Sequence, residues 1–96
     1  GALRPAVTLT DPTSGRSLEI FTDQPGIQIY TGNYLDSSLK GKHGITYKQH
    51  AAICLETECF PDAINQTKWH EEWPSGCLNP DETYKHTMVH RFTTGY

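Results

Sequence analysis

Short runs of alternating apolar and polar residues, separated by turn residues, make up most of this 96-residue sequence. Residues 7–10 and 16–22 alternate in this way, and the Asp-Pro-Thr-Ser-Gly segment at 11–15 between them has strong turn chemistry. The pattern predicts a β-hairpin with a five-residue loop. A second turn at 23–26 is followed by a third predicted strand at 27–31.

The second half of the chain contains two more predicted strands, at 50–57 and 83–92. Residues 33–49 are predicted to form a long loop, and long loops inside compact domains are often functional. Prolines and glycine interrupt residues 59–82, which are predicted to be irregular. No stretch has a sustained helical period, so the sequence predicts an all-β fold.

Composition limits the classes of partner. The hydrophobic fraction of 35% and mean hydropathy of -0.59 are low for a small domain that must fold alone, so its apolar faces are predicted to pack against a surface outside this chain. A net charge of -3 gives no basic surface for nucleic acid. There is no apolar run of about 18 residues to span a membrane and no signal peptide pattern. Three cysteines without CxxC spacing are predicted to be reduced thiols, which favours a cytoplasmic protein.

The predicted strand at 50–57 places Glu56 in an unusual setting. Because strand residues alternate faces, Ile53 and Leu55 are predicted to point into a core, while Glu56 lies on the other face among small side chains. Gln28, between two isoleucines, also faces away from its apolar neighbours. A carboxylate and an amide on neighbouring strands suit the hydroxyls of a sugar. On spacing alone, however, a glutamate on a strand is more often a solvated surface residue.

The sequence offers little support for other chemistries. On one strand, His86 and His90 would lie about 13 Å apart, too far to share a metal ion. They are predicted to line one strand face with Tyr84, Met88 and Phe92. His70 lacks a second set of spaced ligands, and no pattern around Cys54 or Cys59 indicates a thiol enzyme. Neither a metal nor a cofactor is predicted.

Several motifs of this sequence resemble sequence blocks of one protein family. Residues 23–35 (DQPGIQIYTGNYL) resemble its xPGxQxYTGNxL block, and residues 54–66 (CLETECFPDAINQ) resemble its CLETQxFPDAxNQ block. Residues 39–42 are similar to its LxGK motif, residues 80–87 to PGExYxHTT, and residues 11–16 to DPxSGR. The matches run in order along nearly the whole chain, which therefore resembles the galactose mutarotases, also called aldose 1-epimerases.

The resemblance implies an antiparallel β-sandwich of the galactose mutarotase-like type, of which residues 1–96 would form the C-terminal portion. It implies interconversion of the α and β anomers of aldohexoses such as galactose and glucose, without a cofactor. Glu56 corresponds to the family's general base, and Gln28 to a glutamine that contacts the sugar.

The sequence departs from the family pattern in three ways. Glu58 replaces a usual glutamine, and the segment at 65–75 is longer. None of the five histidines matches the family's acid histidine, so the resemblance implies that the missing N-terminal part of the sandwich supplies it. The chain is therefore expected to be a truncated copy of an isomerase, and the sequence leaves open whether it is active alone. The alternative is a non-catalytic carbohydrate-binding or interaction module of the same fold.

Overall fold

The computed structural model describes residues 2–66 and 74–95, and it is all-β, as predicted. The two sheets are antiparallel, and the only helical elements in the described ranges are two single turns of 3-10 helix. In chain order the elements are β1 (Arg4–Thr10), β2 (Arg16–Thr22), β3 (Gly26–Tyr30), η1 (Lys42–Gly44), β4 (Cys54–Glu58), η2 (Ala63–Asn65) and β5 (Met88–Thr94).

The predicted hairpin is formed by β1 and β2, and its turn is held by local hydrogen bonds. The carboxylate of Asp11 accepts from the backbone N–H of Thr13 at 3.2 Å and of Ser14 at 3.3 Å. Gly15 has a φ of 75°, in the left-handed region, and its N–H donates to the Asp11 carbonyl at 2.9 Å. A side chain is strained in that region, so glycine suits this position.

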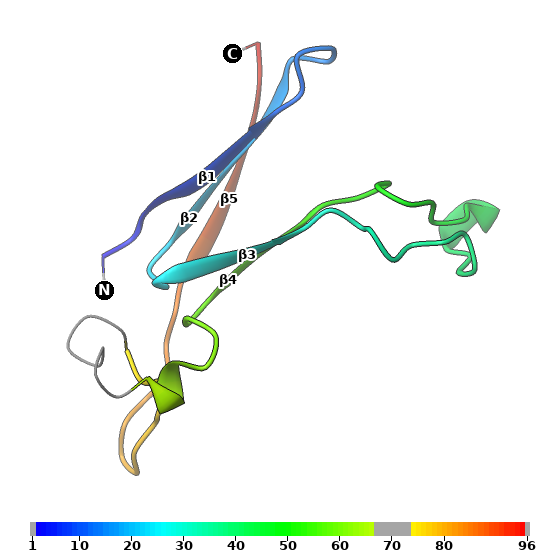
Figure 1. The fold of residues 1–96 in the computed structure, drawn as a ribbon. Helices are drawn as coiled ribbons and strands as arrows, with labels where there is room; N and C mark the ends of the chain where they lie inside the picture. Colours follow the sequence, from blue (N-terminus) through cyan, green and yellow to red (C-terminus); the bar gives the residue numbers. More distant parts are fainter. Residues whose placement is uncertain (1, 67–73, 96) are drawn as a thin grey trace.

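The central strand of the first sheet is β2, which pairs with β1 on one side and β5 on the other (Figure 1). Ile20 lies near its middle and is completely buried. On β5, the Arg91 guanidinium pairs with the Glu19 carboxylate and lies 5.5 Å from the centre of the Phe21 ring. These contacts fix the last strand of the chain against the second.

The second sheet is a two-stranded ribbon made of β3 and β4. Figure 1 shows this ribbon running at an angle to the three-stranded sheet, with the loop between its strands extending away from that sheet. Within the described residues, no strand of one sheet pairs with a strand of the other. The chain passes between the two sheets twice, through the short turn between β2 and β3 and through the longer connection between β4 and β5.

The chain is much less compact than a typical domain of its size. Its radius of gyration is 17.3 Å, whereas about 12.5 Å is usual for this length. Its accessible surface is 7647 Å², against roughly 5,500 Å² for a compact protein of this mass. Ile20 and Ala63 are the only buried apolar residues in the described ranges, and β5 is exposed along its whole length. The sheets thus leave most of their apolar faces uncovered.

The predicted strand at 50–57 is wrong at its start, because β4 begins at Cys54. His50 has a φ of 62°, which is incompatible with an extended strand. Its backbone N–H donates to the Gly32 carbonyl at 3.2 Å, and the N–H of Ala51 donates to the Lys48 carbonyl at 3.1 Å. These hydrogen bonds make a turn of the residues that precede β4.

The predicted strand at 83–92 is also misplaced, because β5 begins at Met88 and ends at Thr94. Residues just before it are held by side chains of the β2–β3 turn rather than by a neighbouring strand. The prediction that Tyr84 and His86 share one strand face with Met88 and Phe92 is therefore wrong. Instead their rings contact each other edge to face, with centroids 4.5 Å apart.

The predicted loop at 33–49 contains η1 and one isolated bridge between Lys40 and Thr46. His70 and most of the longer segment at 65–75 lie outside the described residues. In the part of the chain that the structure describes, no helix is long and apolar enough to cross a membrane.

Candidate functional site

The register of the β3–β4 ribbon places Gln28 directly opposite Glu56. Residues opposite each other in an antiparallel pair project to the same face, with Cβ atoms about 4.5–5.5 Å apart. Both side chains are exposed, and neither forms a hydrogen bond or ion pair with another described residue. The structure thus brings together the two residues that the sequence singled out, and leaves their polar groups available to a ligand.

The same face continues in both directions along the ribbon. Tyr30 lies opposite Cys54 on one side of the pair, and Gly26 lies opposite Glu58 on the other. A Cβ atom on Gly26 would come within 3.1 Å of the Phe60 ring, so the absence of a side chain there lets this ring approach the ribbon. Glu58 is half-buried, unlike Glu56. Tyr30 is half-buried as well, whereas Cys54 opposite it is exposed.

The opposite face of β4 is only partly buried. Leu55 and Thr57 are half-buried, as strand alternation predicts, and the Thr57 hydroxyl donates to the Met88 sulfur of β5 at 3.3 Å. Ile53, which was predicted to point into a core, precedes β4 and is 40% exposed. The prediction that this strand covers a closed core is therefore wrong for the described residues. Leu55 and Thr57 nevertheless lie on the face of β4 that was predicted to be the apolar one.

A second group of polar side chains gathers at the β2–β3 turn, around Gln24, which is only 5% exposed. Its side-chain N–H donates to the Tyr84 hydroxyl at 3.0 Å, and its side-chain oxygen accepts from the Cys59 thiol at 3.7 Å. Its backbone carbonyl accepts from the Arg4 guanidinium at 2.8 Å. Gln24 therefore connects the start of β1, the end of β4 and the segment that leads into β5.

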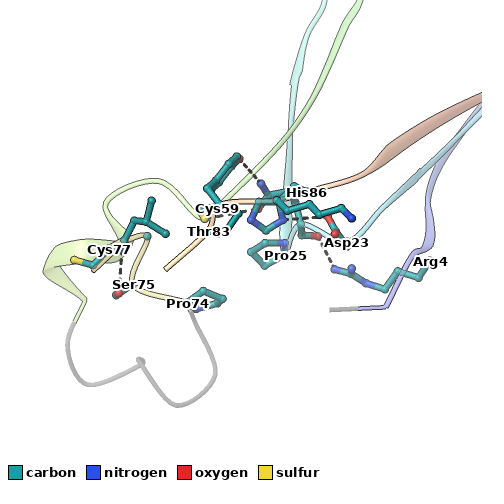
Figure 2. A pocket seen from close by; sticks show the side chains of 14 residues that line it. Arg4, Asp23, Pro25, Cys59, Pro74, Ser75, Cys77, Thr83 and His86 are labelled. Atoms are coloured by element: carbon teal, nitrogen blue, oxygen red, sulfur yellow. Dashed lines mark hydrogen bonds and ion pairs between the residues drawn. The ribbon is translucent and has the colours of Figure 1, made fainter. Parts of the chain in front are cut away.

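Asp23, the neighbouring residue, holds the same segment from its other side. Its carboxylate accepts from the Thr87 backbone N–H at 3.1 Å. It also accepts from His86 Nδ1 at 3.1 Å (Figure 2). Desolvation acts to raise the pKa of Asp23, but these two hydrogen bonds and the charge of His86 outweigh it, so the pKa lies below its ordinary value. The ionised carboxylate is thus the form that fits this turn.

These residues border a cavity of about 610 Å³, which Cys59, Cys77 and the segment at 74–78 also line (Figure 2). No sequence pattern predicted this cluster. Its members come from distant parts of the chain, and no local spacing marks them. In the described residues, no three His, Cys, Asp or Glu side chains gather closely enough to hold a metal ion.

Comparison with known proteins points to one family. A model of the aldose 1-epimerase family matches residues 1–91. The chain is 50% identical to the galactose mutarotase of Homo sapiens and 49% identical to that of Mus musculus, each over 80 residues that cover 83% of this chain. It is 44% identical to the aldose 1-epimerase of Haemophilus influenzae over 66 residues, or 69% of this chain.

These alignments cover 22% of each mammalian protein and 19% of the bacterial one, so the chain spans about a fifth of the length of these relatives. The match nevertheless includes both strands of the ribbon that carries Gln28 and Glu56. The all-β, antiparallel architecture is consistent with this match. The chain belongs to the aldose 1-epimerase family.

Proposed function

We propose that this chain contributes the general base and one sugar contact to an aldose 1-epimerase that interconverts the α and β anomers of aldohexoses such as galactose and glucose. The observation that carries the proposal is the register that sets Gln28 opposite Glu56 on an exposed face. Its support from comparison is the family match over residues 1–91.

In the proposed reaction, a carboxylate oxygen of Glu56 accepts the proton of the anomeric hydroxyl. The electron pair of that O–H bond forms the C1 carbonyl as the bond between C1 and the ring oxygen breaks, and an acid protonates the ring oxygen. Rotation about C1–C2 and reversal of the proton transfers then give the other anomer. Glu56 ends as the carboxylate with which it began, so no cofactor or metal is consumed.

Gln28 has a different task in this proposal. Its amide has both donor and acceptor groups, so it can bind a sugar hydroxyl next to the one that Glu56 deprotonates. Holding the ring in one orientation matters, because a misplacement of about 1 Å can cost a hundredfold in rate. The rigid spacing across an antiparallel pair suits this orienting role.

The acid is proposed to come from polypeptide outside these 96 residues. By the family resemblance, this chain is the C-terminal portion of a β-sandwich, and none of its histidines matches the acid. The uncovered apolar faces of the two sheets are where the remaining part of such a sandwich would pack. The described cysteines are free thiols, which suits a reducing compartment, and we propose the cytoplasm.

Polarimetry of freshly dissolved α-D-galactose tests the role of Glu56, in a protein that carries this chain together with the polypeptide that supplies the acid. We expect Glu56→Gln to reduce the protein's acceleration of mutarotation by at least about a hundredfold, the usual minimum contribution of a positioned base. Glu82→Gln is the matched control, because Glu82 accepts a hydrogen bond only from the nearby Asn79 N–H among the described residues. Equal rates for Glu56→Gln and wild type would rule out Glu56 as the base.

A carbohydrate-binding or interaction module without catalysis is the second candidate, favoured by the small core and large exposed surface. Chemical-shift mapping with galactose separates the two candidates. Shifts at the Gln28 side-chain amide without any acceleration of mutarotation would favour binding alone.

A further inference from the structure

The cavity at the β2–β3 turn has no part in the proposed reaction, because neither Gln28 nor Glu56 lines it. Its volume of about 610 Å³ lies within the usual range of small-molecule sites, which is roughly 300–1,000 Å³. Charged side chains, an aromatic ring and proline rings line it, from β1, the β2–β3 turn and the segments at 74–78 and 83–86. This combination is typical of a site for a small organic ligand that carries a charge.

Arg4 supplies one positive charge to this cavity. Its guanidinium donates to the Thr22 carbonyl at 3.2 Å and to the Gln24 carbonyl at 2.8 Å. Figure 2 shows it reaching from β1 toward the Asp23 side chain. A guanidinium carries more N–H donors than these two bonds use, so others remain to bind a ligand. Both partners are neutral, and Arg4 forms no ion pair with another described residue. Its charge is therefore held in place but not neutralised.

Lys85 lines the same cavity and supplies a second positive charge. It is exposed and forms no ion pair with another described residue. Among the described lining residues the one carboxylate is that of Asp23, which already accepts from the Thr87 N–H and from His86 Nδ1. With His86 neutral, two positive charges and one negative charge give this lining a net charge of +1, although the whole chain carries -3. The cavity therefore favours an anion.

Tyr84 gives the cavity an aromatic wall. Its hydroxyl accepts from the Gln24 side chain at 3.0 Å, and its ring contacts the His86 ring edge to face. The residue nevertheless remains 64% exposed. The ring is thus fixed in position while much of its surface stays open beside the charged groups. Pro25 adds a second apolar ring to the lining. An aromatic surface of this kind packs well against a ring of a ligand.

We propose that this cavity binds a small organic phosphate, with the phosphoryl group at Arg4 and Lys85 and an apolar ring of the ligand against Tyr84. A phosphate monoester carries a charge of about -1.5 to -2 at pH 7 and several strong acceptor oxygens. A guanidinium can pair with two of those oxygens at once, and an ammonium acts on them as a point charge. A carboxylate, with a single negative charge, would satisfy fewer of these donors. Phosphate binding here requires neither Gln28 nor Glu56, so it does not depend on the proposed epimerase activity.

Titrations followed by phosphorus NMR test the inference, in a protein that carries this chain together with the polypeptide that supplies the acid. The probes are phenyl phosphate, methyl phosphate and inorganic phosphate, at an ionic strength of about 0.15 M. We expect all three to bind. Phenyl phosphate should bind roughly twofold to tenfold more tightly than methyl phosphate, the range of one aromatic contact.

Lys85→Gln removes one positive charge from the cavity. We expect it to raise the Kd for each phosphate probe roughly twofold to fivefold, the range of an exposed ion pair. Lys42→Gln is the matched control, because Lys42 is also exposed and forms no ion pair with another described residue, but lies in η1, outside the cavity. It should leave all three constants unchanged. Equal increases in the two lysine variants would show that the probes respond only to the net charge of the chain, and would overturn the site.

Arg4→Gln removes the guanidinium and should raise the Kd for the phosphate probes about tenfold or more, since hydrogen bonds between charged groups are the strong ones. Because Arg4 also holds the β2–β3 turn, Arg4→Lys serves as a second variant. It keeps the charge and loses the planar fork, so its Kd should lie between those of wild type and Arg4→Gln. Wild type that binds phenyl phosphate no more tightly than methyl phosphate would overturn the contact with Tyr84. Wild type that binds none of the three probes would overturn the site.

Discussion

Exchanging the two side chains of the candidate pair is a stringent perturbation of the site. The double variant Gln28→Glu with Glu56→Gln keeps the charge, size and composition of the ribbon. It moves the carboxylate from β4 to the directly opposite position on β3, a displacement of about 5 Å between Cβ atoms. If only the presence of a carboxylate on this face mattered, the double variant would retain activity.

We expect the double variant to be as slow as Glu56→Gln alone. A general base must lie within about 2.6–3.2 Å of the atom whose proton it removes, so a displacement of 5 Å takes the carboxylate out of reach. A positioned base contributes about 10²–10⁴ in rate. At 1.36 kcal/mol for each factor of ten, the expected loss is roughly 2.7–5.4 kcal/mol of transition-state stabilisation.

Polarimetry with α-D-galactose gives the rate, and urea denaturation checks that the ribbon is intact. Both side chains are exposed and form no hydrogen bond or ion pair with another described residue. The free energy of unfolding should therefore change by no more than about 0.5 kcal/mol. A double variant that is stable and works within tenfold of wild type would refute the argument from register.

Three further predictions concern the frame that holds the ribbon. Gln24→Ala should lower the free energy of unfolding in urea by about 1–2 kcal/mol, because a nearly buried amide loses its hydrogen bond to Tyr84; no change would show that the turn does not depend on it. Gly32→Ala should lower the free energy of unfolding, measured by thermal denaturation, by at least about 1 kcal/mol, and by more than Gly76→Ala does. Both glycines have a positive φ, but only at Gly32 would an added Cβ have neighbours within 4 Å. Equal losses would show that the added Cβ at Gly32 is not crowded. The folded-state pKa of Asp23 is lowered, so the stability that its carboxylate contributes is complete above the unfolded-state pKa and is lost as pH falls through the folded-state pKa. Asp23→Asn should therefore weaken the pH dependence of the free energy of unfolding in urea between about pH 5 and pH 2. An unchanged pH dependence would refute this.

Features set by neighbouring residues could be predicted from the sequence. The β1–β2 hairpin depends on hydrogen bonds from Thr13 and Ser14 to the carboxylate of Asp11, all within one short turn. Strand alternation likewise placed Gln28 and Glu56 each on a polar face. That they lie directly opposite each other depends on the register of two strands joined by a long loop, which alternation cannot supply.

Features set by distant residues were predicted wrongly or missed. The start of β4 depends on the contact between His50 and Gly32, and the segment before β5 is held by Asp23, whose partner Thr87 lies 64 positions away. A run such as residues 83–87 has good strand composition, but these side-chain contacts hold it in another conformation. The stacking of the Tyr34 ring on the Tyr30 ring could not be predicted either, because it requires the turn at Gly32 to bring the two rings together.

The pairing of β2 with β5 has a consequence for the order of folding. The ion pair between Glu19 and Arg91 joins residues 72 positions apart, whereas the hydrogen bond between Thr10 and Ser17 in the hairpin spans 7. Closing the longer loop costs roughly 2 kcal/mol more in chain entropy. The β1–β2 hairpin is therefore expected to form early, with one edge of β2 unpaired until the last strand arrives. During that interval the unpaired edge is the part of the chain most prone to intermolecular strand pairing, so the rate at which β5 docks sets how long the chain is vulnerable to aggregation.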